Sequence, residues 1–288
     1  MDYVAPPDVV QAMVEGGCKK AALSTGQLLL RGAVSGAFLG FATSLAITAA
    51  VQSGVPLVGA LVFPVGFVMI VLFGMELVTG NFALLTTAAL ARRLRPGAVL
   101  RNWGWVFLGN LLGSLLYGVL LYVVLSQGGT TSGGPVAEKL VAVAQAKTTA
   151  YQKLGLPGFF TVLAKAVLCN WMVCMGVLMA LVARSTTGKI LAAWLPIATF
   201  FAQGFEHSVV NMFVIPTGML LGADVSLAQW WLWNQLPVTL ANLASGALFV
   251  GVVFYLSYPP QEAPAAEPPA TETQPAPVPQ ELATSTTP

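Results

Sequence analysis

One histidine is the most chemically versatile side chain in this otherwise apolar chain. His207 lies between Glu206 and Ser208 inside a long hydrophobic run, and it is the single histidine of 288 residues. Imidazole is the only side chain whose ordinary pKa lets its charge change between pH 5 and 8. This residue type in this setting indicates proton transfer, or hydrogen bonding to a passing ligand.

Two glutamates occupy matching polar breaks in hydrophobic segments. Gly74-Met75-Glu76 resembles Gly204-Phe205-Glu206, and an asparagine follows each break at Asn81 and Asn211. We predict that both glutamates accept hydrogen bonds from backbone amides freed at the breaks, and that both asparagines hold loop backbone. Leu77 stands where His207 would have its counterpart, so His207 departs from a structural pattern that the glutamates obey. This departure favours a functional role for His207.

Composition excludes several classes of protein. The chain is 56% hydrophobic and 8% charged, whereas soluble domains carry roughly 25% charged residues. A net charge of +2 does not favour a nucleic-acid-binding surface. The cysteines, Cys18, Cys169 and Cys174, form no metal-ligand pattern and are read as small apolar residues. We therefore expect an integral membrane protein that binds lipid and no nucleic acid, and that needs no metal and no cofactor.

The hydrophobic segments predict an all-α fold with six transmembrane helices, because about 20 apolar residues span a bilayer. Residues 1–25 read as an amphipathic cytoplasmic segment, residues 26–257 as the transmembrane channel domain, and residues 258–288 as a disordered Pro-rich cytoplasmic tail. The expected spans are 26–52, 58–91, 102–126, 158–183, 187–221 and 228–257.

The distribution of basic residues predicts the orientation. Three basic clusters fall on one face of a six-span chain, and such clusters mark the cytoplasmic side. They comprise Lys19, Lys20 and Arg31; Arg92, Arg93, Arg95 and Arg101; and Arg184 and Lys189. Both termini are therefore expected in the cytoplasm, and residues 127–157 are expected to form an outer loop.

Rare polar residues reveal an internal repeat. Arg31 matches Lys165 at an offset of 134, and the two glutamate breaks match at 130. Asn102 and Asn110 match Asn234 and Asn242 at 132, and these four are read as contacts between helices. Each half holds three spans, so the halves must insert with opposite orientation. An inverted 3+3 repeat with broken second and fifth helices predicts a transport site near the midplane.

Lys165 is a second candidate for contact with a ligand. The inverted topology places it near the outer end of the fourth span, whereas Arg31 lies near the cytoplasmic end of the first. Lys165 is therefore either an anchor whose amino group reaches the membrane surface or a positive charge that attracts anions to the outer mouth.

Three motifs in order resemble the formate/nitrite transporter family: Glu76-Leu77-Val78-Thr79-Gly80-Asn81, Leu168-Cys169-Asn170-Trp171-Met172-Val173-Cys174 and Gly204-Phe205-Glu206-His207-Ser208. The resemblance covers about 1–257 and implies an aquaporin-like protomer in a homopentamer of a bacterial inner membrane. Each protomer would have its own pore for small monovalent weak-acid anions, with formate or nitrite as the expected substrate. The chain would then be a channel or transporter and not an enzyme.

The resemblance also assigns roles to individual residues. It implies that His207 is the pore histidine, that Thr79 supplies a hydroxyl on the broken second helix, and that Asn170 is the asparagine of the fourth helix. Val78 stands where formate-type members often have Phe. The implied apolar constrictions comprise Phe63, Phe67, Leu77, Val78, Val173 and Phe200.

These assignments suggest a mechanism and leave alternatives open. An anion is costly to desolvate in a constriction, whereas a neutral acid passes more cheaply. His207 could donate a proton or a hydrogen bond to the anion, with Thr79 orienting it and Lys165 concentrating anions. The same family includes hydrosulfide- and lactate-type transport. Asn81 and Asn211 also suggest an aquaporin-like pore for neutral solutes, although neither break reads Asn-Pro-Ala. A membrane-embedded enzyme is disfavoured, because the sequence offers no metal cluster and no positioned nucleophile.

Overall fold

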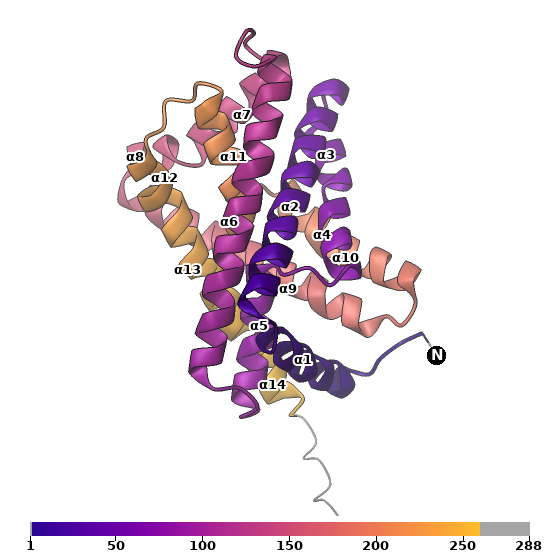
Figure 1. The fold of residues 1–288 in the computed structure, drawn as a ribbon. Helices are drawn as coiled ribbons and strands as arrows, with labels where there is room; N and C mark the ends of the chain where they lie inside the picture. The colour runs from indigo at the N-terminus through magenta and orange to yellow at the C-terminus, as the bar shows by residue number, and fades with distance from the viewer. Residues whose placement is uncertain (1, 260–288) are drawn as a thin grey trace, which may run out of the picture.

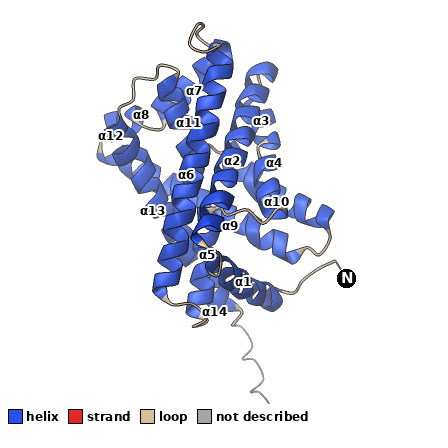
Figure 2. Ribbon diagram, in the orientation of Figure 1, coloured by secondary structure: helices blue, strands red, loops and turns tan. Residues whose placement is uncertain are grey.

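A computed structural model describes residues 2–259, which form a bundle of helices (Figures 1 and 2). Within residues 2–259, four helices are long and apolar enough to cross a membrane, and two further crossings are each divided into shorter apolar helices. In chain order the spans are α2 (Thr25–Ser53); α3 (Pro56–Val62), α4 (Pro64–Leu72) and α5 (Val78–Leu90); α6 (Pro96–Ser126); α9 (Leu156–Val182); α10 (Thr186–Ala202) and α11 (Ser208–Leu220); and a last helix over Leu227–Ser257. The last comprises α12 (Leu227–Trp230), α13 (Leu236–Ala244) and α14 (Val253–Ser257), joined by the π-helical segments Trp231–Gln235 and Ser245–Val252.

The second and fifth spans are broken at equivalent points, as the polar motifs predicted. After α4 the chain turns at Gly74, whose φ is 62°, and resumes as α5. After α10 it turns at Gly204, whose φ is 65°, and resumes as α11. Glycine adopts these left-handed angles without steric cost. Each break therefore ends one half-helix and aims the N-terminus of the next into the protein.

Matching hydrogen bonds relate the two halves. The Glu76 amide donates to the Arg31 carbonyl, and the Glu206 amide donates to the Lys165 carbonyl, each at 3.4 Å. The amide that opens α5 reaches Asn110 Oδ1 at 3.0 Å, and the amide that opens α11 reaches Asn242 Oδ1 at 2.9 Å. The residues paired by sequence offset therefore make the same contacts in both halves.

The halves run in opposite directions through the bundle. The C-terminal part of α2 lines one pocket of the molecule, together with residues of α7 (Gly134–Ala146). The C-terminal part of α9, the equivalent helix of the second half, lines a different pocket, together with residues of α1 (Pro6–Ala21). These contacts fit the inverted topology predicted from the sequence.

The segment that was expected to be an outer loop contains two helices. The segment contains α7 and α8 (Thr149–Leu154). Helix α7 packs closely on α11: a Cβ on Gly218 of α11 would lie 2.5 Å from the side chain of Ala144 of α7. The sequence analysis did not predict these two helices, because the segment mixes charged with apolar residues and is too short to span a bilayer. These helices instead cover one end of the bundle.

Helix α1 closes the opposite end. Its apolar face buries Val9, Val10 and Met13 in a cluster with residues of α5. Asp2 accepts hydrogen bonds from the amide and hydroxyl of Ser185, which precedes α10, and these bonds lower the pKa of its carboxyl. The amphipathic N-terminal segment therefore exists as a docked helix. The predicted Pro-rich tail lies, from residue 260 onward, outside the described residues.

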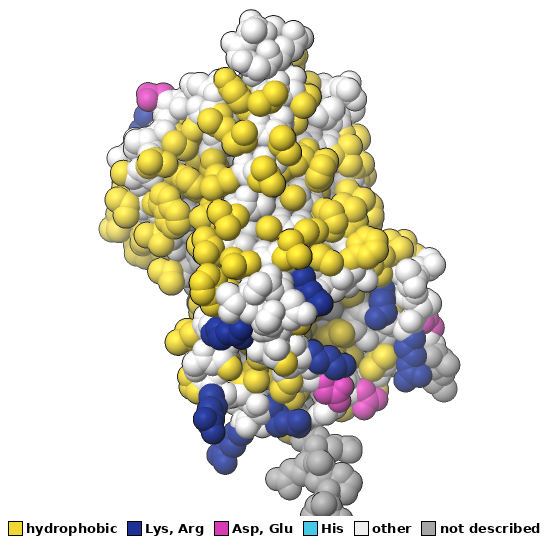
Figure 3. Space-filling model, viewed as in Figure 1, with side chains coloured by type: hydrophobic (Ala, Val, Ile, Leu, Met, Phe, Trp, Pro, Cys, Tyr) yellow, Lys and Arg dark blue, Asp and Glu magenta, His cyan; other side chains and the backbone are white. Residues whose placement is uncertain are grey.

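The space-filling view separates apolar from basic surface. Figure 3 shows a broad hydrophobic surface over most of the bundle, while Lys and Arg side chains gather at the end where α1 and α14 lie. A belt of exposed apolar side chains is the surface that lipid tails or neighbouring copies would cover.

Small residues allow α2 and α6 to approach closely. A Cβ on Gly109 would lie 2.6 Å from the Leu29 carbonyl oxygen and 3.0 Å from the Gly32 Cα atom. A Cβ on Gly113 would collide with the Ala33 backbone carbonyl. Small residues stabilise membrane helix pairs by permitting this backbone contact.

We expect Gly113→Ala to destabilise the protein. The added methyl would push α6 away from the Ala33 backbone, and overpacking of this kind costs about 1–3 kcal/mol. Thermal unfolding of the purified protein in detergent measures the effect. Gly104→Ala is the matched control on the same helix, because among residues 2–259 a Cβ there meets no atom within 4 Å apart from its own stretch of helix. Equal melting temperatures for the two variants would contradict the prediction.

Candidate pore site

His207 and Thr79 meet at the centre of the protein, one from each broken span. His207 is the N-cap residue of α11, Thr79 lies in the first turn of α5, and both are buried. The distance between His207 Nε2 and Thr79 Oγ1 is 3.1 Å. The structure thus brings together two of the sequence-predicted pore residues, which lie 128 positions apart.

A backbone contact determines which ring nitrogen of His207 accepts a hydrogen bond. The Val210 amide donates to His207 Nδ1 at 3.2 Å, so Nδ1 carries no proton in this arrangement. A neutral ring then has its proton on Nε2, which donates to Thr79 Oγ1. The Thr79 hydroxyl hydrogen is left free for a ligand.

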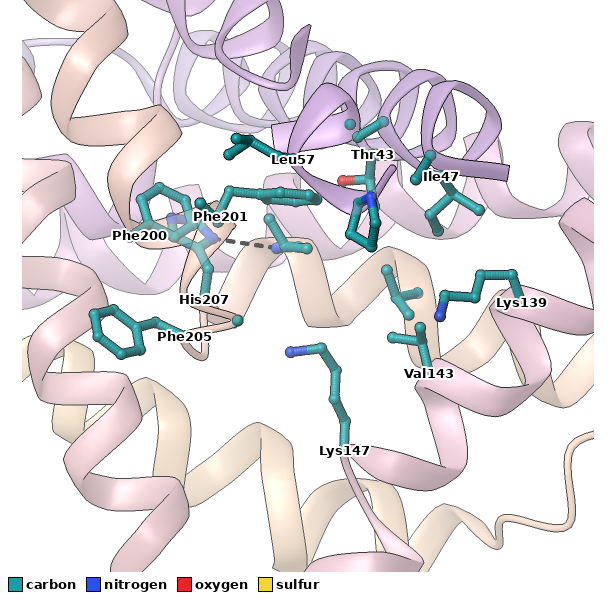
Figure 4. A pocket seen from close by; sticks show the side chains of 18 residues that line it. Thr43, Ile47, Leu57, Lys139, Val143, Lys147, Phe200, Phe201, Phe205 and His207 are labelled. Atoms are coloured by element: carbon teal, nitrogen blue, oxygen red, sulfur yellow. Dashed lines mark hydrogen bonds between the residues drawn. The ribbon is translucent and has the colours of Figure 1, made fainter. Parts of the chain in front are cut away.

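One vestibule leads to His207 from the side of α7. It is a cavity of about 290 Å³, and we call it the α7 vestibule. Figure 4 shows Lys139 of α7 and Lys147, which directly follows α7, reaching into it across from Phe200, Phe201 and His207. Its walls are mainly apolar, so the lysines and the histidine are its distinctive chemistry.

A second vestibule, of about 230 Å³, enters from the side of α1, and we call it the α1 vestibule. Its lining includes Lys20 of α1 and Phe67 of α4. It also includes Leu77, which directly precedes α5, and Lys189 of α10. Leu77 is the repeat counterpart of His207. The equivalent positions of the two halves therefore place an apolar side chain in the α1 vestibule and an imidazole in the α7 vestibule. The two cavities have no described lining residue in common.

Apolar side chains lie between the vestibules. All six predicted constriction residues are at most 4% exposed and belong to one buried cluster: Phe63, Phe67, Leu77, Val78, Val173 and Phe200. The Phe200 ring stacks on the His207 imidazole with centroids 5.8 Å apart, and Phe63 packs edge-on against Phe200 at 5.7 Å. A solute passing from one vestibule to the other would have to lose most of its water here.

Asn170, on α9, holds the backbone of α5 just after the break in the second span. Its Nδ2 donates to the carbonyls of Thr79 at 3.2 Å and Asn242 at 2.6 Å. Its Oδ1 atom is buried without a hydrogen-bond partner among the described residues. Asn170 therefore positions Thr79 and leaves one acceptor beside it.

Buried ion pairs hold both breaks, and they differ from the expected contacts. Glu76 accepts from Lys20 Nζ at 2.8 Å and from Asn81 Nδ2 at 2.7 Å. Backbone amides were expected as the glutamates' partners, but a full charge in a low dielectric needs a cation to offset its desolvation.

The second half repeats this network. Glu206 accepts from Lys147 Nζ and Asn211 Nδ2, each at 2.8 Å, and from the Tyr151 hydroxyl at 2.9 Å. Asn81 and Asn211 also donate to Asn102 and Asn234 respectively. The break asparagines therefore use their side chains to link a carboxylate to a neighbouring helix, whereas a bond to loop backbone was expected.

Lys165 lies outside both vestibules. Its Nζ is 5.8 Å from the centre of the Tyr151 ring, and its carbonyl holds the Glu206 amide. The cations that do line the vestibules are Lys20, Lys139, Lys147 and Lys189, none of which the sequence analysis assigned to the pore. The sequence did hold an indication of Lys20 and Lys147, because two glutamates buried in a membrane each require a cation nearby.

Comparison with known proteins identifies the architecture. The family model described as formate/nitrite transporter matches residues 7–256, which is most of the chain. The chain belongs to the formate/nitrite transporter family. Membership makes this transporter a multi-pass integral membrane protein and an anion channel of that family, and not an enzyme.

Individual relatives agree with this assignment. The transporter is 36% identical over 268 residues to an uncharacterized transporter of Bacillus subtilis strain 168, covering 90% of this chain and 95% of that protein. It is 32% identical over 269 residues to a formate channel of Bacillus thuringiensis, covering 91% and 98%. A solved pentameric formate channel with formate bound superposes with a TM-score of 0.66 at 26% identity, over 81% of this chain and 97% of that one. The predicted fold class is confirmed.

Proposed function

We propose that this protein is a channel or transporter for small monovalent anions of weak acids, with formate or nitrite as its substrate. The observation that carries the proposal is the hydrogen-bonded pair of Thr79 and His207 between two vestibules that each contain lysines. The similarity to a formate channel from Bacillus thuringiensis supports the same substrate class.

The proposed mechanism reduces the cost of desolvating the anion. An unpaired carboxylate in an apolar passage is very unfavourable, whereas its neutral acid is not. His207 holds its proton on Nε2 against Thr79 Oγ1, which leaves the Thr79 hydroxyl to donate to the anion. When His207 takes up a proton from water in the vestibule, Nε2 can release its own proton through the Thr79 hydroxyl to the anion. The ring then ends neutral, and a neutral acid crosses the aromatic constriction. Asn170 fixes the Thr79 backbone while this occurs.

Assembly and orientation form part of the proposal. We infer a homopentamer in a bacterial inner membrane, with both termini in the cytoplasm. The pentameric relative and the exposed apolar belt support the assembly, and the basic residues at the end that carries α1 support the orientation.

Other small solutes are the competing substrates. Hydrosulfide or lactate would use the same donor pair, because each is the anion of a weak acid. A neutral-solute pore would need no lysine in its vestibules. The vestibule lysines therefore favour an anion.

We expect selective anion flux from purified protein in liposomes. Stopped-flow light scattering with formate, nitrite, hydrosulfide, lactate and glycerol should give protein-dependent flux of formate or nitrite well above that of glycerol. The flux should rise as the external pH falls, because proton and anion cross together. Protein-free liposomes correct for direct permeation of the neutral acids. Glycerol flux equal to formate flux would replace the proposal with a neutral-solute pore.

A further inference from the structure

Each vestibule contains two lysines in different electrostatic states. In the α7 vestibule Lys147 is paired with Glu206, and in the α1 vestibule Lys20 is paired with Glu76, each at 2.8 Å. Both glutamate side chains are at most 2% exposed. Each pair therefore contributes almost no net charge to its vestibule.

The second lysine of each vestibule has no carboxylate partner within residues 2–259. Lys139 and Val143 of α7 line the α7 vestibule together with Lys147, which directly follows that helix (Figure 4). Lys189 lines the α1 vestibule from the first turn of α10, where the helix dipole adds further positive potential. The net positive charge of both cavities thus comes from Lys139 and Lys189.

The repeat does not account for these two lysines. Lys20 and Lys147 occupy equivalent places in their halves, but the residue eight positions before Lys20 is Ala12, whereas the residue eight positions before Lys147 is Lys139. Lys189 approaches from α10, on a different element from Lys20. An unpaired cation in each vestibule is therefore a shared property of the two mouths and not a by-product of duplication.

We propose that Lys139 and Lys189 are the residues that attract the substrate anion into the two vestibules, while Lys147 and Lys20 serve the buried glutamates. This inference rests on the proposed anion transport. A single charge at the mouth of a low-dielectric cleft raises the local concentration of an oppositely charged solute. Each lysine should therefore set the apparent affinity for the anion that arrives from its own side.

Flux measured from each side of the membrane at two ionic strengths tests the proposal. In vesicles of one orientation at about 0.01 M salt, Lys139→Met should raise the half-saturating formate concentration about three- to tenfold for entry through the α7 vestibule. Lys189→Met should do the same for entry through the α1 vestibule only. At about 1 M salt, where screening acts within about 3 Å, both effects should disappear. Lys139→Arg should retain the wild-type value.

Two exposed lysines outside the vestibules serve as matched controls. Lys153→Met removes a cation from α8 on the α7 side, and Lys19→Met removes one from α1 beside Lys20. Neither should shift the half-saturating concentration. If Lys139→Met behaves as Lys153→Met does at low salt, the inference fails although the channel still transports anions. Absence of anion flux in the wild-type protein would instead overturn the proposed function itself.

Discussion

Replacing His207 with phenylalanine should reduce formate or nitrite flux about ten- to hundredfold, toward the level of protein-free liposomes. The substitution keeps an aromatic ring beside Phe200 but removes the Nε2 donor that faces Thr79. A hydrogen bond to a charged group contributes about 1.5–3 kcal/mol, and each 1.4 kcal/mol is about a factor of ten in rate. Stopped-flow flux of the purified variant in liposomes measures the loss.

The asparagine variant separates proton transfer from hydrogen bonding. His207→Asn can still donate and accept hydrogen bonds, but its amide does not titrate. Retained flux with weakened dependence on pH would assign proton transfer to His207. Size-exclusion chromatography of both variants checks that assembly is intact, because loss of the cap on the Val210 amide is itself mildly destabilising. Unchanged, pH-dependent flux in both variants would refute the mechanism.

Lys147→Met should cause a large loss of stability. It leaves the Glu206 carboxylate buried without its cation, and breaking such a pair by removing one partner costs about 3–5 kcal/mol. The thermal midpoint of the protein in detergent should fall accordingly. Lys139→Met is a matched control in the same vestibule, eight residues earlier in the chain, and it should melt like the wild type.

A double variant identifies the cause of this loss. Glu206→Gln removes the charge that Lys147 neutralises, so adding it to Lys147→Met should restore part of the lost stability, and the two single effects should not be additive. Additive losses would show that the lysine stabilises the protein through packing alone. Equal melting of Lys147→Met and Lys139→Met would contradict a structural role for the pair.

Rare polar residues made the membrane architecture predictable. In a chain so rich in apolar side chains, the positions of Glu76 and Glu206 carry information because burial there is costly. Their spacing predicted the repeat, and the polar clusters that they open predicted that the second and fifth spans are broken. The turn itself lies at Gly74, before Thr79-Gly80-Asn81, which belong to α5. The apolar residues predicted the lengths of the spans. They did not predict which helices pack against each other, since any two hydrophobic helices can do so. The close approach of α2 to α6 depends on glycines such as Gly109 and Gly113, which their sequence alone does not pair with a partner helix.

The cations of the site were harder to predict. Lys147 lies in a segment with Glu138, Lys139 and Lys153, and its composition resembles that of a solvated loop. Its role depends on α7 folding back against α11, which neither periodicity nor charge pattern specifies. Lys165 had the better sequence argument, because it is a charge within a span, yet its side chain lies over Tyr151. Sequence offset paired Lys165 with Arg31, and the carbonyls of both make equivalent contacts, but the offset gave no direction for the Lys165 side chain.

The order of synthesis along the chain makes a neutralising cation available before each buried carboxylate enters the membrane. Lys20 precedes Glu76 by 56 residues, and Lys147 precedes Glu206 by 59, so each cation leaves the ribosome before the acid it will neutralise. The asparagines that complete each network also belong to the same half. Neither half therefore has to wait for the other before its charge is compensated. The contact between Thr79 and His207 joins the halves and can form only after His207 has been synthesised, so the pore centre is among the last parts of the protein to be assembled.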